Sequence, residues 1–78
     1  MTLDRCPVDV DLKVVDVGLV GAVRLRMREV GLHVGATVRV THRAPFGGRV
    51  IGIGASRIAV DSATAALIEV GPVVGSLR

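Results

Sequence analysis

This sequence contains very few aromatic residues, cysteines and lysines, and it has no long apolar run. Phe46 is its one aromatic residue and Cys6 its one cysteine. A single cysteine cannot form an internal disulfide, which fits a reducing compartment, so we expect a cytoplasmic protein. The longest uncharged apolar stretch, residues 17–23, is much shorter than the roughly 20 residues of a membrane span. The first residues also lack the pattern of a secretory signal.

Valine and glycine are abundant instead, and half of the 78 residues are apolar. This length allows one domain, which we place over residues 1–78 with its core at about residues 11–72. A domain this short buries only about 60–65% of the surface that its unfolded chain exposes. That leaves little room for the deep pocket of an enzyme, so a binding or adaptor module is favoured. Assembly into a homo-oligomer would bury further apolar surface and stays an alternative.

The charged residues are unevenly distributed along the chain. Residues 1–16 carry four acidic and two basic side chains, whereas residues 17–78 carry three acidic and eight basic ones. Nine of the ten basic residues are arginines. Arginine favours bidentate contacts with carboxylate or phosphate groups. The pattern therefore points to an acidic protein surface or to nucleic acid as the partner.

Alternating apolar and polar residues predict five short strands separated by glycine-rich turns. The expected strands span residues 11–17, 37–43, 49–53, 57–60 and 67–70. Residues 1–10 are expected to form a loose, extended lead-in, and Asp61 to cap one helical turn over residues 63–66. Residues 73–78 receive no assignment. Five short strands with one longer helix indicate a small mostly β barrel, either SH3-like or an OB-fold.

Residues 19–30 change to helical spacing. The apolar stripe expected to be buried consists of Leu19, Val20, Val23, Met27 and Val30. Gly31 and Leu32 follow at the positions of a Schellman motif, which predicts the end of this helix. Leu25 lies nearly opposite the stripe between Arg24 and Arg28. A lone exposed leucine needs no explanation, but one among arginines also fits a protein-contact surface.

The residues that could carry metal or catalytic chemistry are few. His33, His42 and Cys6 are the candidate metal ligands, and their spacing matches no zinc motif. His42 continues the period-two pattern of Val40, which places it against the barrel. We therefore expect no resident cofactor. Weak iron or zinc binding by these residues, in a metal-binding or metal-sensing module, is the alternative. Because Cys6 has no nearby base and no phosphate loop follows Gly48, the sequence argues against an enzyme.

A nucleic-acid-binding barrel is a competing hypothesis because the sequence pI is about 10.5. Proteins that bind single strands stack bases on aromatic side chains, however. Phe46 is the one residue of that kind here, and its simplest interpretation is a loop residue packed on the barrel. The near-absence of aromatic residues therefore weighs against nucleic acid as the partner.

Several segments together resemble a known family. The run R-M-R-E-V-G-L over residues 26–32, followed by Val34 and Gly35, is similar to the R-L-x-E-L-G-L-x-x-G signature of the ferrous iron transport protein A (FeoA) family. The resemblance continues through residues 38–40, 43–48, 56–60 and 66–70, and it covers about residues 12–72. At residues 48–49 the family often has Asp-Pro instead of Gly-Arg.

The resemblance implies an SH3-like barrel with the helix between the first two strands, related to the C-terminal domain of iron-dependent repressors. It also implies a cytoplasmic accessory protein that binds and regulates the FeoB-type membrane ferrous-iron transporter, which carries a GTPase domain. The residues that we predict to contact this partner are Arg24, Leu25 and Arg28 on the outer face of the helix, and Pro45 and Phe46 in the hairpin loop. The arginines would meet carboxylates, and Phe46 would be an apolar anchor. Gly31 and Gly35 would serve as structural turns.

Overall fold

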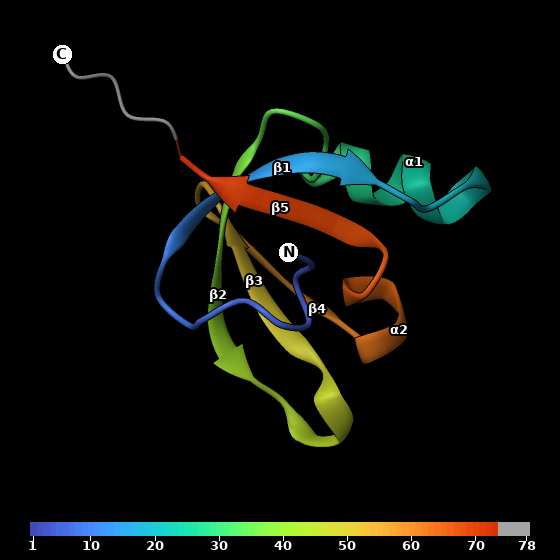
Figure 1. The fold of residues 1–78 in the computed structure, drawn as a ribbon. Helices are drawn as coiled ribbons and strands as arrows, with labels where there is room; N and C mark the ends of the chain where they lie inside the picture. Colours follow the sequence, from blue (N-terminus) through green and yellow to red (C-terminus); the bar gives the residue numbers. More distant parts are fainter. Residues whose placement is uncertain (74–78) are drawn as a thin grey trace, which may run out of the picture.

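The computed structural model describes residues 1–73, so most of the unassigned segment 73–78 lies outside the described residues. Five antiparallel strands form one sheet in the order β4-β3-β2-β1-β5 (Figure 1). The elements in chain order are β1 (Asp11–Val17), α1 (Gly21–Glu29), β2 (Thr37–Arg43), the 3-10 turn η1 (Pro45–Gly47), β3 (Arg49–Ile53), β4 (Ser56–Val60), α2 (Ser62–Ala65) and β5 (Ile68–Pro72). The helix between the first two strands and the mostly β architecture confirm the predicted fold class.

The strand bounds follow the alternation of the sequence closely. The first three strands have the predicted limits, and β4 begins one residue earlier than expected, at Ser56. β5 differs more, because it continues through Gly71 to Pro72 instead of ending at Val70. Pro72 is tolerated because it is the last residue of a strand at the edge of the sheet, where a missing N–H costs little.

The core lies on the inner face of the curved sheet. Its fully buried strand residues are all aliphatic, and they include Val14, Val38, Val40, Ile51, Ile68 and Val70. Each such side chain stabilises the fold by about 1.5–3 kcal/mol through removal of apolar surface from water. The neighbouring positions along the strands face solvent, as the period-two pattern predicts.

The first ten residues are part of the folded structure, so the prediction of a loose lead-in is wrong. Leu3 and Cys6 are fully buried in the core. The Leu3 N–H donates to the carbonyl oxygen of Ile68 at 3.0 Å, and the Val70 N–H donates to the carbonyl oxygen of Met1 at 2.7 Å. The amino-terminal residues therefore pair with β5 and cover an edge that would otherwise have unpaired backbone groups.

The apolar stripe of α1 is mostly not buried, so the expectation that it packs against the core is wrong. No residue of α1 is buried: Val20, just before the helix, is 82% exposed, and Val23 is about half exposed. Met27 packs partly against the core, and Leu19 is buried but precedes the helix. The helix lies beside the end of β1 and does not cover the inner face of the sheet (Figure 1). Periodicity identifies an apolar stripe, but it does not supply a surface to bury it.

The end of α1 and the capping of α2 by Asp61 are as predicted, although α2 spans Ser62–Ala65, one residue earlier than expected. The Gly31 N–H donates to the carbonyl oxygen of Arg28 at 3.0 Å, and the Leu32 N–H donates to that of Met27 at 2.9 Å. With φ of 99° at Gly31, these bonds form a Schellman motif that places Leu32 in the core. Before α2, the Asp61 carboxylate accepts a hydrogen bond from the Thr64 backbone N–H at 2.8 Å.

Candidate docking surfaces

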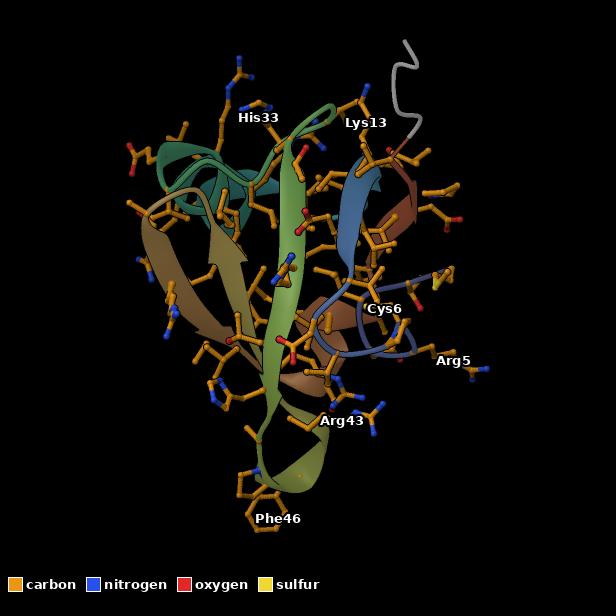
Figure 2. The ribbon with its side chains drawn as sticks, turned by 90° about the vertical axis from the view of Figure 1, so that its left-hand side faces the viewer. Arg5, Cys6, Lys13, His33, Arg43 and Phe46 are labelled. Atoms are coloured by element: carbon orange, nitrogen blue, oxygen red, sulfur yellow. The ribbon has the colours of Figure 1, made fainter. Side chains whose placement is uncertain are left out.

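Phe46 lies at the tip of the loop between β2 and β3, and its side chain is 100% exposed (Figure 2). The expectation that it packs on the barrel is therefore wrong. The tip projects beyond the ends of the two strands, so no core surface lies within reach of the ring. Phe46 also adopts a left-handed backbone conformation with φ of 62° and ψ of 26°, which is uncommon for residues other than glycine.

The loop that carries Phe46 is held in place by Arg49. One terminal nitrogen, Nη1, donates to the carbonyl oxygens of Gly47 at 2.8 Å and Gly48 at 3.0 Å. The other, Nη2, donates to the carbonyl oxygen of Asp4 at 2.5 Å. The Ala44 N–H closes the loop by donating to the Gly48 carbonyl oxygen at 2.9 Å. These contacts fix the loop to the amino-terminal segment, so the aromatic ring is presented on a constrained backbone.

Sequence reasoning did not assign Arg49 a role. The one feature of the sequence that distinguished Arg49 was that Gly-Arg occupies residues 48–49, where the FeoA family often has Asp-Pro. The structure explains the arginine, because its guanidinium spans a gap between two segments that are 45 residues apart in sequence. A contact of that kind has no local pattern in the sequence.

At the helix, the structure separates the three predicted contact residues. Leu25 is 59% exposed on the outer side, as expected. Arg24 instead turns back toward the sheet, where its Nη1 donates to the carbonyl oxygens of Val17 at 2.7 Å and Leu19 at 3.4 Å. Arg24 stays exposed, but these bonds hold its guanidinium against the end of β1 and do not leave it free on the outer face, which corrects that part of the prediction. Its hydrogen bonds satisfy carbonyls at the end of β1 and join the helix to that strand.

A shallow hollow of about 380 Å³ lies between the carboxyl end of α1 and the segment that follows it. Its lining residues are Val17, Arg24, Arg28, Leu32, His33 and Val34. Two guanidinium groups and an imidazole thus gather around an apolar floor. Such a combination fits a carboxylate whose neighbouring residue is aliphatic, because arginine binds carboxylates with charge-assisted hydrogen bonds.

The predicted contact residues fall into two separate patches. The loop patch consists of Pro45 and Phe46, and the helix patch consists of Arg24, Leu25 and Arg28. Figure 2 places His33, which borders the helix patch, at the opposite end of the molecule from Phe46. The structure therefore does not combine the two patches into one surface.

The three candidate metal ligands are not brought together either. Cys6 is buried, its Sγ–H donates to the Leu3 carbonyl oxygen at 3.4 Å, and burial raises the pKa of its thiol. His33 is exposed near α1, far from Cys6 (Figure 2). Within residues 1–73, no three His, Cys, Asp or Glu side chains are grouped so that they could hold a metal ion. The described residues thus do not form a metal centre from these candidates.

His42 is exposed, which contradicts the expectation that it packs against the barrel. The register of β2 with β3 shifts between Val40 and His42, which indicates a bulge at this point. A bulge inserts one extra residue, so the alternation of inward and outward side chains is interrupted there. The period-two extrapolation from Val40 fails for this reason.

No helix within the described part of the chain has the length and apolar character needed to cross a bilayer. One sheet of five short antiparallel strands, with a helix between the first two strands, defines a small SH3-like domain. It presents an exposed aromatic residue on the loop between β2 and β3. The sequence profile of the FeoA domain matches residues 1–72, and the chain therefore belongs to the FeoA domain family.

Solved structures of other members agree with this assignment. FeoA from Chlorobium tepidum is 26% identical, with a TM-score of 0.86 over 99% of this chain and 74% of its own. Iron(II) transport protein A from Clostridium thermocellum is 27% identical, with a TM-score of 0.84 over 94% of this chain. The present chain spans only 46% of the length of that protein.

A third structure is the zinc complex of FeoA from Stenotrophomonas maltophilia, which is described as an SH3 domain protein with a suggested role as a ferrous iron transport activating factor. It is 29% identical, with a TM-score of 0.75 over 90% of this chain and 88% of its own. ScaR with bound zinc and the manganese regulator SloR share the fold at 20% and 21% identity. None of the curated proteins matches the sequence.

Proposed function

We propose that this protein is a cytoplasmic accessory factor of ferrous iron transport that binds and regulates the FeoB-type membrane transporter through protein contact. Membership of the FeoA family supports the link to iron transport. The observation that carries the contact is Phe46, a fully exposed aromatic residue on a constrained loop. Aromatic side chains that become buried in a partner dominate many interface energies.

The conformation of the loop patch supports a binding role. A left-handed backbone conformation in a residue with a large side chain costs free energy, and such strain persists where the surrounding structure enforces it. Arg49 enforces it here through its bonds to the Gly47 and Gly48 carbonyl oxygens. Because the loop is already ordered, docking of the ring loses little conformational entropy.

The charge around the loop indicates which partner surface it fits. Arg43 is exposed at the end of β2, close to the tip that carries Phe46 (Figure 2). An apolar pocket bordered by carboxylates would complement this arrangement, since opposite charges across an interface steer association. The helix patch, with Leu25 and Arg28 exposed, has the same combination of an apolar and a basic side chain.

Because the two patches lie at opposite ends, we assign them different weights. The loop patch is the principal contact, since its aromatic ring is fully exposed and its backbone is fixed. The helix patch is a second contact, to which Leu25 and Arg28 contribute directly. Arg24 positions the helix, because its guanidinium is bonded to the backbone at the end of β1.

The test measures the affinity of the chain for the full transporter encoded in the same genome and for its isolated cytosolic domain. The Phe46→Ser variant should bind at least tenfold more weakly, and Arg28→Gln about two- to fivefold more weakly. Val15→Ser is the matched control, because it removes a half-exposed aliphatic side chain from the sheet. It should leave both affinity and iron uptake unchanged.

Two results would contradict the proposal. One is that the wild-type chain binds neither the full transporter nor its cytosolic domain. The other is that Phe46→Ser binds as tightly as the wild type and supports normal iron uptake in cells. Either result would mean that this chain does not regulate the transporter through contact at the loop patch.

We also propose that the protein is not an enzyme. Among the described residues, Cys6 is buried with a raised thiol pKa. Ser56 begins β4 after a tight turn and Ser62 begins α2, which are ordinary structural positions for serine. In the described part of the chain, no serine or cysteine is hydrogen-bonded to a histidine or carboxylate, as nucleophilic catalysis needs. Thr41 Oγ1 lies 3.0 Å from His42 Nδ1, but this hydroxyl donates to the Val50 carbonyl oxygen, so His42 does not act on it as a base.

Weak metal binding is the second candidate function, and the zinc complex of the Stenotrophomonas maltophilia relative favours it. In this chain, the separated His33 and His42 would act singly. Calorimetric titration with zinc should therefore show weak binding, and a His33→Ala/His42→Ala variant should lose most of it. Tight binding that survives this double substitution would reveal a site elsewhere.

A further inference from the structure

Charged residues form a row across the outer face of the sheet, and the groove that they line includes no residue of either patch. Strand pairing places Asp11 of β1 opposite Arg39 of β2, Arg39 opposite Gly52 of β3, and Gly52 opposite Arg57 of β4. Directly paired residues project from the same face. Arg39 and Arg57 therefore flank a position without a side chain, with their backbones about 10 Å apart.

The guanidinium groups in this row retain free donors. Arg39 Nε donates to Asp11 Oδ1 at 2.9 Å, and both side chains remain about half exposed. Within the described residues, the two Nη groups of Arg39 and the guanidinium of Arg57 make no hydrogen bond. Asp11 thus orients Arg39 through its Nε and leaves the rest of its donor fork available for a second oxygen anion.

The hollow over Gly52 is an elongated groove, larger than the space that one bound ion would fill. It has a volume of about 490 Å³, and its lining residues are Asp11, Thr37, Val38, Arg39, Thr41, Gly52, Gly54 and Arg57. Thr37 and Thr41 lie on either side of Arg39, which extends the groove over about 13 Å of β2. That length matches about four residues of an extended peptide.

We propose that this groove binds an extended acidic segment of a partner protein, with one carboxylate lying over Gly52 between Arg39 and Arg57. Gly52 has no side chain of its own, the Thr41 methyl group comes within 3.3 Å of where its Cβ would lie, and the two cationic donors on either side are complementary to a carboxylate. A nucleic acid strand fits less well, because no aromatic ring lines the groove to stack against its bases. This site goes beyond the proposed function, since it lies apart from the loop patch and needs no transporter.

The experiment titrates the isotope-labelled full chain with a blocked peptide, Thr-Val-Glu-Val-Thr, and follows backbone amide resonances. The amides of Thr37, Gly52 and Arg57 should shift on binding. Arg57→Gln should weaken binding two- to fivefold, the range of an exposed ion pair. Asp11→Asn should strengthen it, because Arg39 is then released for the peptide. Arg5→Gln is the matched control, because it removes one exposed positive charge elsewhere. It should change the affinity for the peptide only slightly, through the lower net charge of the protein.

Several outcomes would overturn the proposal. They are equal binding of the same peptide with Gln in place of Glu, shifts that are scattered away from the groove, or no shifts at all. Binding that is unchanged in Arg57→Gln would also contradict it. Larger shifts of the same amides with inorganic phosphate or a pentathymidine would show that the groove prefers phosphate. Since the transporter is absent from every arm, none of these results depends on the proposed function.

Discussion

Replacement of Phe46 by glycine should stabilise the fold while it removes the proposed partner contact. Phe46 holds φ at 62°, and its fully exposed ring gains nothing from the core. A left-handed conformation costs an L-residue about 1–2 kcal/mol. Glycine avoids this cost, but it adds about 0.4–1 kcal/mol of conformational freedom to the unfolded chain. We therefore expect Phe46→Gly to raise the free energy of unfolding by about 0.5–1 kcal/mol.

Thermal melts followed by circular dichroism can resolve this change. In a domain of this size, each kcal/mol shifts Tm by about 4–8 °C, so the expected rise is about 2–8 °C. Phe46→Ala is the matched control, because it removes the ring but keeps an L-residue in the left-handed conformation. Its Tm should stay within a few degrees of the wild type. Both variants should lose affinity for the transporter to a similar extent.

A lower Tm in both variants would refute the reasoning. It would mean that the ring contributes packing to the folded protein and that the loop patch is not a free surface. A rise in Tm for alanine as large as that for glycine would also contradict it, because the gain would then not come from the backbone conformation. A gain in stability with loss of binding is the signature expected of a strained contact residue.

Three further substitutions test the structural elements that position the two patches. Arg49→Met removes three hydrogen bonds to carbonyls and also one buried Nε–H without a partner, so urea unfolding should show a loss of about 2–3 kcal/mol. Gly31→Ala should destabilise more than Gly35→Ala, because the two have similar φ of 99° and 93° but only the first Cβ would crowd a β3 side chain, at 3.1 Å. Asp61→Asn should reduce the acid sensitivity of Tm. Hydrogen bonding by the Thr64 side chain, and secondly by the Thr64 backbone N–H, lowers the folded pKa of Asp61 below its ordinary 3.8. The stabilisation from Asp61 is therefore complete above pH 3.8 and is lost as the pH falls through the lower folded pKa.

Each of these has an outcome that contradicts it. Arg43→Gln removes a similar charge that makes no hydrogen bond among residues 1–73, so a loss as large as that of Arg49→Met would show that charge, and not the bonds to carbonyls, stabilises the loop. If Gly31→Ala and Gly35→Ala lower the free energy of unfolding equally, the close approach of the residue 31 Cβ to the β3 side chain has no effect on stability. If the Tm difference between wild type and Asp61→Asn is the same at pH 6 and pH 2.5, the cap does not depend on the ionised carboxylate.

The features predicted correctly from the sequence are local ones. The Schellman end of α1 depends on Gly31 and on bonds that reach back three and five residues. The cap of α2 depends on Asp61 and a backbone N–H three residues on. The strand limits follow from alternation within five to seven residues. Interactions this short in sequence leave a pattern in the residues themselves.

The wrong expectations share a different cause. Val20 and Val23 fit a helical stripe, yet the helix lies where no core surface covers them. His42 follows the strand period, yet a bulge interrupts the register before it. Arg24 was placed outward by its position opposite the stripe, but the carbonyls at the end of β1 attract its guanidinium inward. In each case the placement of the elements in three dimensions overrides the periodicity.

The sequence by itself therefore determined where the strands and the helix lie along the chain and where the turns between them fall. Through the resemblance of its motifs, it also indicated the FeoA family. Only the tertiary structure decided which side chains are available for contact: the free ring of Phe46, the inward Arg24, and the row in which Arg39 and Arg57 flank Gly52. The physical reason is that local structure follows from neighbours along the chain. Exposure and cross-strand register depend on residues tens of positions apart, whose pairing no short pattern records.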